Sequence, residues 1–189
     1  PGSARGRVMS LIDGKGTAEV IPCDSCFFGL FEHCEGLVKA PELPATTLTE
    51  GCYEMMFDNC AALTDAPELP ATELKRSCYR SMFKDCSALK ETPVLVADEM
   101  APYCYREMFW GCNAIKEAPE LPAMKLAEEC YAAMFGFCGG LTETPALPAM
   151  KLEKGCYNGM FTWCFALERV PYLPAEELVD SCYISMFEG

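Results

Sequence analysis

The chain has 189 residues, of which 51% are hydrophobic, and its 28 acidic and 15 basic residues give a formal net charge of −13. This acidic excess argues against nucleic acids and anionic membrane surfaces as partners, because both are bound through clustered lysine and arginine side chains. No stretch approaches the roughly 18 uninterrupted apolar residues of a membrane-spanning helix. The simplest interpretation of the charge is that it keeps a repetitive surface soluble.

Residues 1–25 carry no copy of the repeat that fills the rest of the chain. Residues 1–3 (PGS) resemble the remnant left after cleavage of an expression tag, so they are set aside when the fold is predicted. Asp13-Gly14 predicts a turn, and residues 17–21 predict a short strand. Because the exposed ends of a repeat array need a polar cap, we expect residues 4–25 to form the N-terminal capping segment.

From residue 26 onward the chain consists of successive copies of a 26-residue motif. The clearest copy opens with CYEMMFDNC, residues 52–60. The opening cysteine recurs at Cys26, Cys78, Cys104, Cys130, Cys156 and Cys182, and the closing cysteine at Cys34, Cys86, Cys112, Cys138 and Cys164. Sequence periods of 20–50 residues indicate stacked repeats. We therefore predict one continuous domain over residues 26–189. The chain stops at Gly189, one residue before the last closing cysteine is due, so we expect this domain to be truncated at its C-terminus.

Each copy of the motif has three parts. In residues 52–60, cysteine, methionine and cysteine fall at i, i+4 and i+8 with aromatic residues between them, which predicts the apolar face of a two-turn helix. Residues 63–70 (LTDAPELP) contain a proline in mid-run and predict a very short, irregular strand. A turn then ends in an anchor residue, found at Leu48, Leu74, Met100, Leu126, Leu152 and Leu178. This layout is typical of leucine-rich repeats. It predicts an α/β solenoid of about seven coils, with short parallel strands on one side and short helices on the other.

The repeated motif also resembles a known family. CYxxMFxxC, the leucine three residues later at Leu63, and then APELPATxL closely resemble the BspA-like leucine-rich repeats of anaerobic, host-associated bacteria. The resemblance covers residues 26–189. It implies a right-handed solenoid, placement at the cell surface or outside the cell, and adhesion to host matrix proteins or to other cells. Val96 and Met100 depart from the pattern in residues 90–115, and because family members differ in ligand, the resemblance does not identify a partner.

The chain's fourteen cysteines admit more than one role. Their spacing does not fit the C-x2-4-C pattern of zinc ligands, and Cys23-x-x-Cys26 lacks the βαβ context of a redox motif. Disulfides are an alternative in an extracellular protein. If residues 52–60 are helical, however, Cys52 and Cys60 lie about 12 Å apart, beyond the roughly 7 Å that a disulfide spans between Cα atoms. Pairing between coils would need an alternation of period two, which the sequence lacks. We favour buried, reduced thiols that act as small apolar side chains.

The sequence offers little support for a catalytic role. His33 is the single histidine of the chain, so no second histidine can act as base or metal ligand. Cys34 follows it directly, and adjacent side chains on a helix point apart. No phosphate-binding loop, zinc-protease motif or nucleophile elbow is present. We predict that the protein is not an enzyme and that it has no cofactor or metal site.

Three positions of the motif vary widely from copy to copy, whereas its core positions hardly change. They are the two residues after the phenylalanine and the residue after the closing cysteine, which should be exposed on the predicted helix. Both tryptophans of the chain and two phenylalanines fall at these positions: Trp110, Phe137, Trp163 and Phe165. Because equivalent positions of stacked coils are neighbours, we expect one aromatic patch, and exposed aromatic patches mark binding sites. The alternative is that these rings pack on a neighbouring segment or a flanking domain.

A second candidate lies on the predicted strands, where Glu42, Glu68, Glu120 and Tyr172 share one position of the motif. Neighbouring strands lie about 4.8 Å apart, and like charges directly opposite one another are destabilising. Repulsion between these neighbouring carboxylates would be tolerated if they bind a cationic partner or calcium. The alternative is that the carboxylates simply spread into solvent.

We therefore predict a monomeric, non-catalytic interaction module at the cell surface. Its expected partner is a protein of the host matrix or of a cell surface, bound through the aromatic patch and the strand position of Glu42. A passive spacer and a carbohydrate-binding module are the two alternatives. Neither nucleic acid nor membrane insertion is expected.

Overall fold

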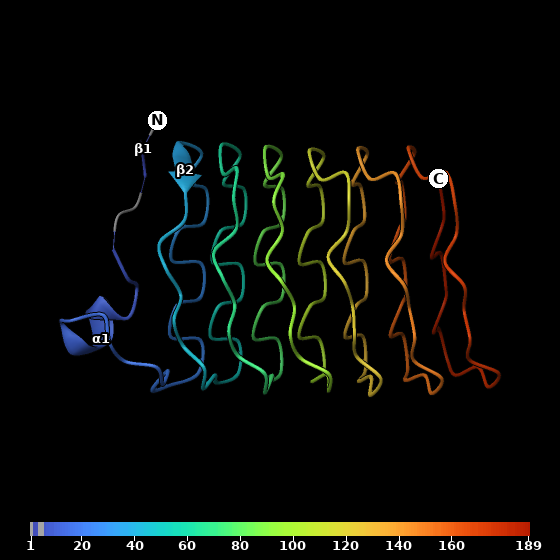
Figure 1. Cartoon of the computed structure of the whole chain (residues 1–189), viewed down its shortest axis with the longest axis horizontal. Coiled ribbons are helices and arrows are strands. Elements are labelled where there is room, and N and C mark those ends of the chain that lie inside the picture. Colours follow the sequence, from blue (N-terminus) through green and yellow to red (C-terminus); the bar gives the residue numbers. More distant parts are fainter. Residues whose placement is uncertain (1, 4–5) are drawn as a thin grey trace.

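The computed structural model describes residues 2–3 and 6–189. Its regular elements are β1 (Gly2–Ser3), α1 (Ser10–Asp13) and β2 (Leu37–Lys39), and β1 pairs in parallel with β2. Figure 1 shows similar coils stacked in a row along the long axis, with the two termini at opposite ends. The chain is therefore a repeat solenoid, as its 26-residue period predicts.

The helices predicted for the motif are absent from the described residues, and this part of the prediction was wrong. Residues 51–59 run instead as a continuous series of turns, which we call the turn ribbon together with its copies in the other coils. Gly51, Met55 and Asn59 have φ angles of 58°, 55° and 57°. These angles lie in the left-handed region, which a right-handed helix excludes. The same three positions have positive φ in all seven coils.

The backbone hydrogen bonds of the turn ribbon alternate between two kinds of partner. The N–H of Tyr53 donates to the carbonyl of Cys78 in the next coil at 3.0 Å, and Met55 donates to Arg80 in the same way at 2.9 Å. The intervening N–H groups donate three residues back within their own coil, as Met56 does to Tyr53 at 3.2 Å. Every second N–H thus binds the neighbouring coil, which fixes the register of the stack.

Two ladders of aromatic rings fill the core. One is formed by phenylalanines from Phe31 to Phe187, with adjacent ring centroids 5.5–5.8 Å apart. The other runs from Phe27 through the tyrosines to Tyr183, with centroids 5.7–5.9 Å apart. The rings of the interior coils are buried between their neighbours. Since no coil covers its own rings, the apolar surface that stabilises each coil is buried by the coils on either side.

The proline-containing side of the coils is less regular than the turn ribbon. Beyond β2 it carries isolated parallel bridges between equivalent positions, such as Lys39 with Asp65 and Glu117 with Glu143. Proline in mid-run donates no ladder hydrogen bond, so longer strands cannot form there. The prediction of short parallel pairing on this side holds only in this fragmentary form.

The segment before the first coil folds against it. α1 ends at Asp13, and the next residue, Gly14, caps it with a φ of 71° in the left-handed region. The Asp13 carboxylate accepts hydrogen bonds from the N–H groups of residues 15–18 and from the Thr17 hydroxyl. Met9 and Ile21 are buried here. The strand predicted for residues 17–21 is reduced to one isolated bridge, from Val20 to Thr47.

Of the three residues interpreted as a tag remnant, Pro1 lies outside the described residues, and Gly2–Ser3 form β1. In the part of the chain that the structure describes, no helix has the length and apolar character needed to cross a bilayer.

Candidate functional site

Four aromatic side chains from three consecutive coils form a continuous surface cluster, which we call the aromatic ridge: Trp110, Phe137, Trp163 and Phe165. The ring of Phe137 lies 4.7 Å from that of Trp110 and 5.7 Å from that of Trp163, measured between centroids. Trp163 in turn meets Phe165 edge-on at 5.6 Å. Phe137 and Trp163 expose 42% and 41% of their surface, and Phe165 exposes 71%. The structure therefore brings together the four residues that the sequence placed in one patch.

The backbone beneath the ridge has the positive φ found at this position in every coil, but it carries unusually large side chains there. Phe137 and Trp163 have φ angles of 59° and 58°. Asparagine, aspartate, histidine and glycine tolerate this left-handed region best, whereas bulky residues there are outliers that cost roughly 1–3 kcal/mol each. The other coils place tolerant residues at the same position: His33, Asn59, Asp85, Gly111 and Gly189. Two coils thus carry large aromatic rings where the backbone favours small polar residues.

Trp110 occupies the preceding position of the ribbon and is half-buried, which corrects the expectation that it is fully exposed. This position points partly inward, since its equivalents Asp58 and Thr162 are only 8% exposed. The indole ring lies directly over Gly136, where an added Cβ would meet a ring carbon at 2.3 Å. Lys84 covers the ring from the preceding coil, with Nζ 6.0 Å from its centroid. Neither Gly136 nor Lys84 was predicted as part of the site, although both share the motif position of Trp110.

Beside the ridge, the turn ribbons of the earlier coils carry charges that pair with one another. Arg80 pairs with Glu54 at 3.3 Å, and Glu107 lies 3.6 Å from Lys84 and 3.3 Å from Arg106. Burial alone would raise the pKa of Glu107, but the nearby Lys84, Arg106 and Arg80 outweigh it and lower that pKa. The carboxylates of Glu54 and Glu107 are therefore neutralised by basic side chains of the same chain.

The second predicted group faces solvent on the proline-containing side. Glu42, Glu68 and Glu120 are exposed, and Tyr172 exposes 84% of its surface. Glu42 is engaged in an ion pair with Arg7 at 2.7 Å. The contacts that define the ridge include none of these four residues. In the part of the chain that the structure describes, no three His, Cys, Asp or Glu side chains form a group able to hold a metal ion.

All fourteen cysteines are free thiols. The closing cysteines have a specific role, because Cys86 Sγ donates to the carbonyl of Phe57 in the preceding coil at 3.1 Å, and Cys112 does the same to Phe83 at 3.0 Å. Burial raises the pKa of the Cys60 thiol to about 12, so this thiol stays protonated and can donate in the same way. The helical distance used to argue against a bond between Cys52 and Cys60 does not apply, because the segment is not helical.

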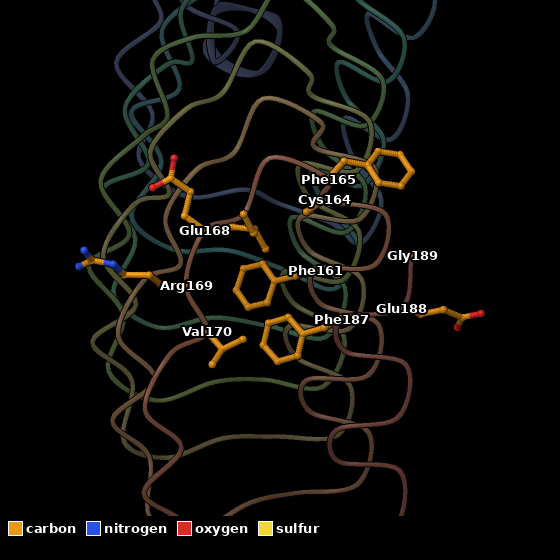
Figure 2. A pocket seen from close by; sticks show the side chains of 10 residues that line it. Phe161, Cys164, Phe165, Glu168, Arg169, Val170, Phe187, Glu188 and Gly189 are labelled. Carbon is orange, nitrogen blue, oxygen red and sulfur yellow. The ribbon is translucent and has the colours of Figure 1, made fainter.

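A hollow of about 730 Å³ lies at the last coil. Figure 2 shows the rings of Phe161 and Phe187 side by side at its centre, Val170 beside them, and Phe165 pointing away. The Phe161 and Phe187 rings belong to the phenylalanine ladder, 5.6 Å apart. In each earlier coil the corresponding ring is covered by the coil that follows. The hollow therefore repeats the packing of the core and does not define a ligand site.

In comparisons with known proteins, no family model matches the chain, and no match was found among the curated proteins or the solved structures.

Proposed function

We propose that the chain is a non-catalytic interaction module that binds a protein partner through the aromatic ridge. One observation carries this proposal: Phe137 and Trp163 hold exposed, stacked rings on backbone positions that disfavour them. Strained residues persist where the surrounding structure stabilises them, and they gather at binding and catalytic sites. Solubility and stability would both favour a small polar residue at these positions, so binding is the simplest reason for the rings.

The wider setting of this proposal comes from the resemblance of the motif to BspA-like repeats. On that basis the solenoid is right-handed, lies at the cell surface or outside the cell, and adheres to a matrix or cell-surface protein. The array suits this role, because an almost invariant core holds surface positions that can vary without disturbing it. In the aromatic ridge, these variable positions carry aromatic side chains in three consecutive coils.

The test is a binding screen of the chain against immobilised matrix proteins and a glycan panel, beside two variants. Trp163→Asn removes a ridge ring while leaving a residue that tolerates the left-handed backbone. Phe28→Ala removes another exposed aromatic side chain, 48% accessible, from the first coil and serves as the matched control. We expect the parent and Phe28→Ala to bind the same protein, and Trp163→Asn to lose that binding without unfolding.

A passive spacer is the main competing function. It predicts that the parent binds nothing in the screen, or that binding survives Trp163→Asn. Either result would remove the reason for assigning the ridge a function.

A further inference from the structure

The orientation of the ridge rings limits what can bind to them. Phe137 is packed between Trp110 and Trp163, and its ring is inclined by only 20° to that of Trp163. The stacked rings of Phe137 and Trp163 each cover one face of the other and leave ring edges free, whereas Trp110 is tilted by 42° to Phe137. Trp110 is further covered by the backbone of Gly136 and by Lys84. The centre of the ridge is therefore a row of ring edges.

The polarity of these edges is defined. An aromatic ring carries negative charge on its faces and positive charge at its edge. The indole N–H groups of Trp110 and Trp163 make no hydrogen bond within the described residues, whereas the Lys84 ammonium group is paired with Glu107 at 3.6 Å. The hydrogen bonds next to the ridge involve Asn113 and Thr162 instead. The ridge therefore offers two indole donors beside the positive edges of its rings.

We propose that the ridge binds a polypeptide segment that presents backbone carbonyl or carboxylate oxygens beside aliphatic side chains. This inference rests on the proposed function and specifies its partner. The oxygens accept from the two indole N–H groups, and the aliphatic groups pack along the ring edges. Sugar rings and cationic side chains bind to aromatic faces. In the ridge, Phe137 lies between Trp110 and Trp163, and Gly136 lies against the Trp110 ring, so these contacts reduce the free area of the faces.

The net charge of −13 predicts the opposite preference, for basic ligands, because a strongly acidic protein attracts them in general. The composition of selected ligands therefore separates the chemistry of the ridge from the charge of the whole chain. Phe165, the most exposed ring at 71%, gives a second contrast. A sugar platform would depend most on this ring, whereas a segment that binds to the stacked edges depends most on Trp163.

The experiment is a selection of short random peptides displayed on phage, with the parent chain as target and Trp163→Asn for counter-selection. Synthetic peptides from the selection, and cellohexaose as a glycan probe, are then titrated against the parent, Trp163→Asn, Phe165→Ala and Phe28→Ala. We expect enrichment of aliphatic and acidic residues and depletion of lysine and arginine. Affinity should fall about tenfold or more in Trp163→Asn, as for other central aromatic contacts, less in Phe165→Ala, and not in Phe28→Ala.

Selected peptides rich in lysine or arginine, or ridge-dependent binding of cellohexaose, would overturn this inference and leave the ridge as a binding site of another kind. Failure of every peptide and of cellohexaose to bind in a ridge-dependent way would overturn the inference. In that case a protein found in the matrix screen to depend on Trp163 would still uphold the proposed function, and its absence would overturn both.

Discussion

Replacing Phe109 with alanine should be among the most destabilising single changes in the chain. Its ring is fully buried and stacked between Phe83 and Phe135, with centroids 5.7 Å from each. Its loss would remove the apolar surface of the ring, leave a cavity between two coils, and interrupt the ladder in the middle of the array. Truncating a buried phenylalanine costs about 3–5 kcal/mol. The regular backbone bonds on both sides restrict how far the coils can move to close the cavity, which favours the upper part of this range.

Phe187 provides the matched control, because it has the same position in the last coil, one stacked neighbour, and 39% of its surface exposed. Phe187→Ala should therefore cost less than half as much, about 1–2 kcal/mol. Equilibrium urea unfolding followed by tryptophan fluorescence gives both values, since Trp110 and Trp163 report from separate coils. Equal losses in the two variants would refute the argument that stacking from both sides supplies the stability of a coil.

Three further predictions concern the thiols, the ridge and the N-terminal segment. Labelling with a thiol reagent under native conditions should modify the two exposed cysteines at once and the buried ones only on unfolding; rapid labelling of all would contradict the buried ladders. Gly136→Ala should displace the Trp110 ring, which an added Cβ would meet at 2.3 Å, and shift its fluorescence to longer wavelength, whereas Gly36→Ala, with open space around it, should leave the spectrum unchanged. The hydrogen bond from the Lys15 N–H, together with those from neighbouring residues, holds the pKa of Asp13 well below its usual value. The order of this loop should therefore be fully present above about pH 4 and be lost only as the pH falls through that lowered pKa. An NMR titration in which Asp13 protonates at about pH 4 would refute this.

The arrangement of the ridge was predictable from the sequence because it depends on register alone. Phe137 and Trp163 are 26 residues apart, and a strict repeat places such residues in adjacent coils whatever the local backbone. Contact with Trp110 and Phe165 followed from the same comparison of copies. The inward tilt of Trp110 did not, because it depends on which way the turn ribbon directs each side chain.

The error over the helices has a simple origin. Residues 52–60 place apolar side chains at i, i+4 and i+8, and nine residues are too few to separate a period of 4.0 from the 3.6 of a helix. A further signal was present: Gly51, Asn59, Ser77, Asp85, Gly111 and Gly155 recur at the positions that the structure shows to be left-handed. Glycine, asparagine and aspartate favour this region, so their recurrence at these positions from coil to coil indicates turns rather than helix.

The sequence by itself determined that the chain is a solenoid, which residues form its core, and which variable positions lie side by side. Each of these depends on the 26-residue register, which is written directly in the order of residues. Only the tertiary structure decided that the turn ribbon replaces the helix, because half of its N–H groups find their acceptors in the next coil and not within their own segment. It also decided that the Phe137 and Trp163 rings stack within 20° of one another while Trp110 is tilted, because these orientations are fixed by packing between coils and by no property of a single repeat.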